Sequence, residues 1–160
     1  MFFFFHVFVR MRQSHPGRPN LAGLCTAKPP CDQRPRRVGA RDSKGDLLRA
    51  DKSYKLYVPK DVPVGQFWSL TLYSENTRRI YDNGSTELRS AGIDSHMKDL
   101  KYNTDGSIDL YVGPEAPAGY EANYMKTVGE DGWFVYFRLY APLQPFFDKT
   151  FSLRDFEVVA

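Results

Sequence analysis

Apolar and polar residues alternate with a period of two in the middle of this chain, which is the pattern of half-buried β-strands. The segment YKLYV at 54–58 alternates in this way, and Pro59 ends it. The segment FWSLTLYS at 67–74 alternates as well, and we expect the face that carries Trp68 to be buried. Both segments therefore predict strands that turn one face toward a core.

Two segments later in the chain also predict strands. The turn-forming residues 103–106 (NTDG) separate 100–102 from 107–112, and this arrangement predicts a β-hairpin. The segment WFVYFRLY at 133–140 is apolar on both faces apart from Arg138. Such a run predicts a central strand that is covered on both sides.

The remaining segments after residue 41 give weaker signals. Residues 77–82 could pair as a weak strand, and 86–100 predict a loop or one or two helical turns. Residues 142–148 begin with proline and predict a short helix whose two phenylalanines face the core. Residues 151–159 predict a last strand. About six strands separated by turn signals indicate an antiparallel β-sandwich or a partial barrel.

Residues 1–41 differ from the rest of the chain in pattern and in charge. They contain eight Lys or Arg and one Asp, a net charge of +7, so the formal +3 of the whole chain leaves −4 for 42–160. Their Pro, Gly, Arg and Gln residues follow neither the helical nor the strand periodicity of apolar positions, which predicts a disordered basic head. This head is either a solvated tail or a region that is not native to the fold. The predicted domain is 42–160.

The head also carries an apolar run and both cysteines. The run MFFFFHVFV at 1–9 is too short to cross a bilayer, and its arginines follow it, whereas a signal peptide has basic residues first. Cys25 and Cys31 match neither a CxxC redox pair nor half of a zinc site, although a local disulfide is open to them. Within 42–160 no basic stripe alternates with aromatic residues, so we expect no nucleic-acid binding.

Four blocks of the chain carry a resemblance to a known family. They are YKLYVPKDVPVGQFWSLTLY at 54–73, DGSIDLYVGPEAP at 105–117, EANY at 121–124 and GWFVYFRLYAPLQPFFDKTFSLRDFEVV at 132–159. In this order they resemble the family called domain of unknown function 1214, over about residues 42–160. The resemblance implies a jelly-roll-like antiparallel β-sandwich, which is incomplete if part of it lies in a missing partner.

The same resemblance implies a context for the domain. Family members usually follow a partner domain, domain of unknown function 1254, in bacterial proteins that are often exported, which suggests a periplasmic or extracellular location. This chain has its basic head in place of the partner domain. It also has Asn123 and Tyr124 where the family usually has Asn-Trp. A sheet edge left open by the missing partner would favour a homo-oligomer.

Arg138 is the first candidate for a functional residue. A charge within an apolar strand needs a partner or a route to solvent. The functional interpretation is a contact with an anion or a sugar. The structural interpretation, which we favour, is an ion pair with a carboxylate such as Asp105, Asp109 or Glu121.

Aromatic residues on the predicted strands form the second candidate. They would make either a platform for a sugar or an ordinary core. The aromatic residues concerned are Trp68, Tyr73, Tyr111, Tyr124, Tyr136 and Tyr140. His96 is the one histidine after the head, and with Asp94 and Asp99 it suggests at most an adventitious metal contact in an exposed loop. We therefore expect no metal site and no cofactor.

No motif for nucleophilic catalysis or phosphate binding is present. The leading hypothesis is a non-catalytic binding or structural module, with carbohydrate as the candidate ligand. One alternative is a hydrolase-like enzyme acting on a glycan or small polar substrate through Arg138 and a nearby carboxylate. Another is a fragment of a larger two-domain protein without independent function. The candidate ligand-binding residues are Arg138, Tyr140, Tyr73, Asn123, Tyr124 and Asp105.

Overall fold

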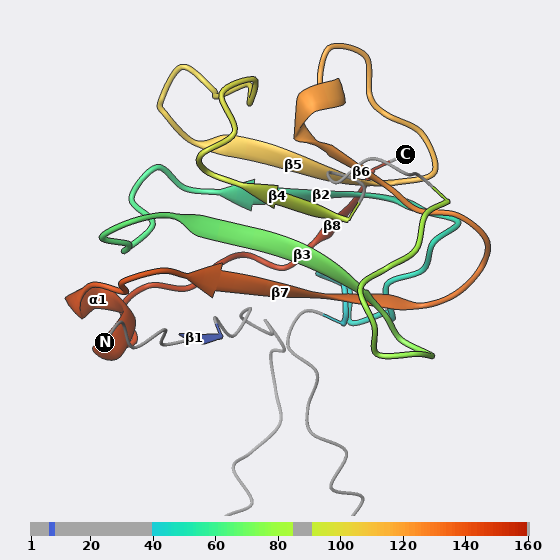
Figure 1. The fold of residues 1–160 in the computed structure, drawn as a ribbon, viewed down its shortest axis with the longest axis horizontal. Coiled ribbons are helices and arrows are strands. Elements are labelled where there is room, and N and C mark those ends of the chain that lie inside the picture. Colours follow the sequence, from blue (N-terminus) through green and yellow to red (C-terminus); the bar gives the residue numbers. More distant parts are fainter. Residues whose placement is uncertain (1–6, 9–39, 85–90, 160) are drawn as a thin grey trace, which may run out of the picture.

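The computed structural model describes residues 7–8, 40–84 and 91–159 (Figure 1). Within these residues the chain forms short strands, one 3-10 turn and one helical turn. In chain order the elements are β1 (Val7–Phe8), β2 (Ser53–Val58), β3 (Trp68–Ser74), β4 (Gly92–Asp94), β5 (Ile108–Gly113), η1 (Glu121–Asn123), β6 (Tyr124–Lys126), β7 (Trp133–Leu139), α1 (Gln144–Phe147) and β8 (Glu157–Val159).

The strands form two sheets, ordered β1-β7-β3-β4 and β6-β5-β2-β8. The longer strands of both sheets, β2, β3, β5 and β7, lie along roughly the same axis across Figure 1. A mainly β, sandwich-like fold with one or two short helices is therefore confirmed. Not every pair is antiparallel, however, because β6 runs parallel to β5. The jelly-roll connectivity that the family resemblance implies stays a prediction.

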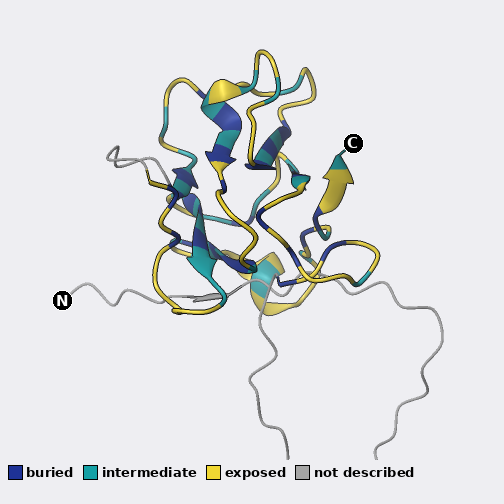
Figure 2. Ribbon diagram, turned by 90° about the vertical axis from the view of Figure 1, so that its right-hand side faces the viewer, coloured by how far each residue is buried: buried dark blue, intermediate teal, exposed yellow. Residues whose placement is uncertain are grey.

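The core lies between the two sheets and consists of the inward-facing residues of each strand. The alternation read from the sequence is correct for β2 and β3, and the face that carries Trp68 is buried. The largest fully buried side chains are Trp133, Tyr54, Phe137, Phe156, Leu48, Leu56, Leu70, Leu72, Ile108, Leu110, Met125 and Leu139. In Figure 2 the central strands combine buried and intermediate positions, whereas β8 and the loops are mostly exposed.

The prediction that β7 is covered on both sides is wrong in part. Its inward residues, such as Phe137, are buried, but Tyr136 and Arg138 on the other face are only half-buried. Aromatic rings occupy this outer face, and a large ring can be apolar and still lie at a surface. The apolar composition of 133–140 therefore suggested more burial than Tyr136 and Arg138 on the outer side of β7 have.

The predicted hairpin at 100–112 is also wrong. The turn at 103–106 forms, with Gly106 in the left-handed region at φ 83°, but β5 pairs with β2 and β6. The backbone of Lys101 instead bonds to the side chain of Asn123. The Asn123 Oδ1 atom accepts from the Lys101 N–H at 2.8 Å, and its Nδ2 donates to the Lys101 carbonyl at 2.7 Å. An amide side chain thus takes the place of the neighbouring strand.

The weaker predictions meet mixed outcomes. Residues 77–82 make a single bridge, between Ile80 and Tyr73, in place of a strand. The stretch 86–100 lies partly outside the described residues, and its described part contains β4 and turns. The predicted helix is α1, but only Phe146 packs against the core, because Phe147 is 58% exposed. The last predicted strand is shortened to β8.

The head contributes one described element. β1 pairs with β7 opposite Leu139 and Arg138. The rest of the head up to residue 39, including both cysteines, lies outside the described residues, so the predicted disorder stays a prediction. In the part of the chain that the structure describes, no helix has the length and apolar character needed to cross a membrane.

Candidate functional site

The side chains on the solvent side of β3 and β7 form a candidate binding surface, which we call the outer face. All seven residues of β3 pair with β7, so side chains on this face lie in facing rows. The outer face consists of Phe67, Ser69, Thr71 and Tyr73 beside Tyr140, Arg138, Tyr136 and Phe134, in that order. It combines aromatic rings, hydroxyl groups and one guanidinium.

Arg138 lies in the middle of the outer face. Its Nη1 atom donates to the Thr71 hydroxyl at 2.9 Å, and Nη2 donates to the Tyr73 hydroxyl. The guanidinium carbon lies 5.6 Å from the Tyr73 ring centroid and 5.5 Å from that of Tyr136. Hydroxyl groups and rings therefore hold the charged group in place.

The ion pair that we favoured for Arg138 is not formed. Among the described residues, no carboxylate lies within ion-pair distance of its guanidinium. Of the three acids considered, Asp109 lies on β5 in the other sheet, and Glu121 begins η1 beside that sheet. The sequence pattern could not assign β5 and β7 to different sheets.

Aromatic groups lie on both sides of Arg138 along the strands. On one side, Phe67 stacks on Tyr140 with ring centroids 3.9 Å apart, and the His96 ring lies 4.5 Å from Phe67. On the other side, Tyr73 stacks on Phe134 at 5.5 Å. The rings of Phe67, Tyr73 and Tyr140 are half-buried, so part of each remains accessible at the surface.

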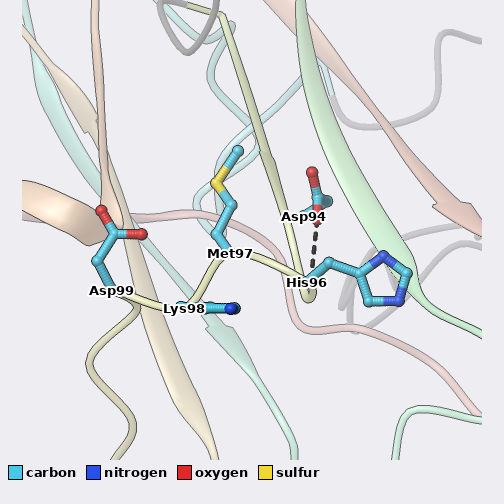
Figure 3. Close-up of a pocket in the computed structure, with 5 residues that line it drawn as sticks. All are labelled: Asp94, His96, Met97, Lys98 and Asp99. Carbon is cyan, nitrogen blue, oxygen red and sulfur yellow. Dashed lines mark hydrogen bonds between the residues drawn. The ribbon is translucent and has the colours of Figure 1, made fainter.

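An open hollow of about 500 Å³ adjoins one end of the outer face (Figure 3). Its lining residues are Asp94, which ends β4, and His96, Met97, Lys98 and Asp99 in the turn that follows. Asp94 accepts a hydrogen bond from the His96 backbone at 2.9 Å, while the imidazole points away from Asp99. No three His, Cys, Asp or Glu side chains are grouped as a metal site among the described residues.

The backbone is unusual at both ends of the outer face. Arg78, whose guanidinium lies 6.0 Å from the Phe134 ring, has φ 60°, and Ala141, which follows Tyr140, has φ 53°. Residues other than glycine occupy this left-handed region at a cost of about 1–2 kcal/mol each. The described residues include a third such residue, Lys149 at φ 58° after α1, so the left-handed conformation alone does not mark the outer face.

The six candidate residues divide into two groups. Arg138, Tyr73 and Tyr140 meet on the outer face, whereas the other three belong to the opposite sheet and its loops. Asn123 is fully buried, and besides its bonds to Lys101 it donates to the Asp109 carbonyl at 2.9 Å. All three hydrogen bonds of its side chain are therefore made inside the protein.

Asp105 and Tyr124 also make internal contacts. Asp105 is exposed and accepts from both the backbone N–H and the hydroxyl of Ser107, which hold the pKa of its carboxyl below the usual value. Tyr124 donates its hydroxyl to the Gly113 carbonyl at 2.8 Å. Burial, and then the nearby carboxylate of Glu115, raises the pKa of Tyr124 to about 12.

This pKa gives a prediction for Tyr124→Phe. The folded-state pKa lies above that of an unfolded tyrosine, about 10, so the unfolded state loses its proton first as the pH rises. The free energy of unfolding of the natural protein, relative to that of Tyr124→Phe, should be constant below pH 10 and fall between pH 10 and 12. Urea denaturation at a series of pH values measures this difference. A difference that stays constant to pH 12 would contradict the prediction.

Four contributors to the outer face, Phe67, Ser69, Thr71 and Phe134, were missed as site residues. Thr71 holds Arg138, and Phe67 stacks with Tyr140. A usable signal was present, because the alternation in 67–74 already places both on the same face as Tyr73. What the sequence did not reveal is that this face adjoins that of β7. Of the remaining aromatic candidates, Trp68 belongs to the core.

The fold and the outer face thus define a small β-sandwich domain with a mixed aromatic and polar sheet surface. Comparison with known families identifies it further. A family described as protein of unknown function (DUF1214) matches residues 36–144, more than half of the chain, so the chain belongs to this family. The expected pairing with domain 1254 stays a prediction.

Two solved structures resemble the domain. The VPA0106 protein from Vibrio parahaemolyticus is 19% identical with a TM-score of 0.63, and the similarity covers 76% of this chain and 29% of that one. An uncharacterised protein from Burkholderia cenocepacia is 22% identical with a TM-score of 0.47, over 70% of this chain and 27% of that one. The chain therefore spans less than a third of either protein, and the first similarity concerns the fold alone. No curated protein matches the sequence.

Proposed function

We propose that this domain is a non-catalytic carbohydrate-binding module and that the sugar lies on the outer face. The observation that carries this proposal is the position of Arg138 between aromatic groups, with its guanidinium held by two hydroxyls. Sugar rings present C–H faces, which pack on aromatic rings, and hydroxyl groups, which need polar partners nearby. The outer face offers both within one sheet surface.

The shape of the face favours an extended ligand over a small enclosed one. Small-molecule sites are usually concave and bury most of their ligand. The hollow at one end of the outer face is open and lies in the turn after β4, while the aromatic groups follow the length of β3 and β7. An oligosaccharide laid along the strands would contact both aromatic groups and Arg138.

The hydrolase alternative requires a carboxylate beside Arg138. Glycoside hydrolysis uses two carboxylates at a separation of about 5–10 Å across the scissile bond. Among the described residues no carboxylate pairs with Arg138. Arg138 is also not one of the residues that line the hollow. We therefore base the proposal on binding.

Replacement of one stacked ring tests the proposal. Wild-type protein should show NMR chemical-shift changes on titration with plant or bacterial oligosaccharides, concentrated in β3 and β7. Tyr140→Ala should bind about 3- to 10-fold more weakly, because one aromatic contact contributes about 0.5–1.5 kcal/mol. The matched control is Tyr57→Ala, since Tyr57 is also half-buried but belongs to β2 in the opposite sheet.

Melting curves of both variants check that they fold, and a bound sugar should raise the melting temperature of the wild type. The proposal fails if no oligosaccharide changes the spectrum or the melting temperature. It also fails if Tyr57→Ala weakens binding as much as Tyr140→Ala, because the ligand would then not lie on the outer face.

A further inference from the structure

We infer that the outer face selects acidic sugars, whose carboxylate binds the Arg138 guanidinium. This inference rests on the proposed function, because it names the class of glycan that the same face takes. It depends on the charge at Arg138, on the hydrogen-bond donors that remain there, and on the position of a second arginine.

The charge of Arg138 is held by neutral groups. Its hydrogen-bond partners are the hydroxyls of Thr71 and Tyr73, and its ring contacts are with Tyr73 and Tyr136. No carboxylate among the described residues neutralises it. A half-buried cation without a counter-ion attracts an anion more strongly than a fully hydrated one does, because the local dielectric constant is lower. The face is therefore complementary to a negative group.

The donors of Arg138 also favour a carboxylate. A guanidinium has five N–H groups, and two of them donate to Thr71 and Tyr73, which leaves three without an acceptor among the described residues. The two hydroxyl contacts fix the plane of the guanidinium. A planar, fixed guanidinium suits a planar carboxylate, which accepts two parallel hydrogen bonds and binds about twice as strongly as a neutral acceptor.

Asp94, the acidic residue nearest to Arg138 in the strand register, does not act as its counter-ion. Asp94 faces Ser69, which in turn faces Arg138, so the carboxylate lies two strands away across the sheet, about 10 Å at the usual strand spacing. Its Oδ1 atom accepts the His96 backbone N–H. Both groups are half-buried, so salt screens their attraction only in part, but at this separation they form no ion pair among the described residues. Asp94 therefore leaves the charge of Arg138 available.

Arg78 extends the positive character of the outer face along β7. It lies over Phe134, four residues before Arg138 on the strand, which corresponds to about 13 Å at the usual rise per residue. The half-buried ring of Tyr136 lies between the two arginines, whereas the ring of Phe134 is buried beneath Arg78. An oligosaccharide with repeated carboxylates matches this alternation of cations and rings better than a single acidic sugar does.

A pair of probes that differ only in charge tests the inference. Oligogalacturonate and its fully methyl-esterified form share one sugar skeleton, and the ester lacks the negative charges. Titration of the full chain with each, followed by NMR or calorimetry, should give binding to the acid at least tenfold tighter than to the ester. In Arg138→Gln this preference should fall to about twofold or less, while Arg138→Lys, which keeps the charge but not the fork, should keep part of it.

Salt provides a measurement that needs no variant. The preference of the wild type for the acid should shrink as sodium chloride rises from 20 mM to 500 mM, because the attraction is screened. If Arg138→Gln fails to fold, this dependence still tests the inference.

The outcomes separate the inference from the proposed function. Equal binding of acid and ester, with both mapping to β3 and β7, would overturn the acidic preference and leave the carbohydrate-binding proposal in place. Absence of binding by either form and by neutral oligosaccharides would overturn both. Tighter binding of a single-stranded oligonucleotide than of any sugar would also overturn both, since cations and stacked rings suit nucleic acids as well.

Discussion

Replacing Asn123 with alanine should lower the free energy of unfolding by about 3 kcal/mol. The side chain is fully buried and makes three hydrogen bonds, two to the backbone of Lys101 and one to the carbonyl of Asp109. Each hydrogen bond contributes about 1 kcal/mol to the free energy of unfolding. In a buried site the backbone groups that lose Asn123 as a partner are not compensated by bulk water. Urea denaturation measures the change directly.

The matched control for this substitution is Asn76→Ala. Asn76 is exposed, and its amide donates to Asp131 at 2.8 Å, so its removal should change the free energy of unfolding by less than about 0.5 kcal/mol. Asn123→Asp tests the mechanism, because aspartate has nearly the same shape but lacks the two N–H donors. If Asn123→Asp were as stable as the natural protein, the donors to Lys101 and Asp109 would not matter.

Replacing Gly113 with alanine should cost about 2 kcal/mol of unfolding free energy. A Cβ atom at this position of β5 would lie 2.7 Å from the Ser53 Oγ and 2.9 Å from the Ser53 Cα. The backbone of β2 must then move, and the two strands share a ladder of five residue pairs. Inserting a methyl group into a tightly packed position costs about 1–3 kcal/mol.

Gly92 supplies the control for Gly113. It also lies in a strand, β4, but an added Cβ would come no closer than 3.5 Å, to the Leu70 carbonyl. Gly92→Ala should therefore change the unfolding free energy by less than about 0.5 kcal/mol in either direction. Equal losses in the two variants would mean that the cost arises from strand propensity and not from the close approach of Ser53.

The strands were predictable where one face is buried and the other faces solvent, because apolar and polar residues then alternate. Alternation in 54–58 and 67–74 identified β2 and β3, because apolar residues there point only toward the core. Residues 100–102 were wrongly predicted to pair with 107–112, because a strong turn signal beside an alternating strand suggests a hairpin. The contact that decides the matter comes from Asn123, a side chain 22 positions away from Lys101, and local patterns contain no information about it.

The candidate site was predictable by residue type but not by location. Arg138, Tyr73 and Tyr140 were chosen as a charge in an apolar strand and as aromatic residues on strands, and they meet on the outer face. Tyr124 was chosen by the same aromatic criterion and Asn123 through the family's Asn-Trp block, yet Tyr124 lies on β6 of the other sheet, Asn123 lies in η1 beside it, and both bond within the protein. Which strands become neighbours depends on packing over the whole chain, and alternation within one strand does not encode it.

The ladder between β3 and β7 has a kinetic consequence. Its paired residues are 59 to 71 positions apart in the sequence, between Ser74 and Trp133 at one end and Trp68 and Leu139 at the other. Contacts of such long range form slowly, because the entropy cost of closing a long loop comes before the favourable energy of the contacts. The hydroxyls of Thr71 and Tyr73 reach Arg138 only across this ladder, so binding competence should arise only once this long-range pairing has formed.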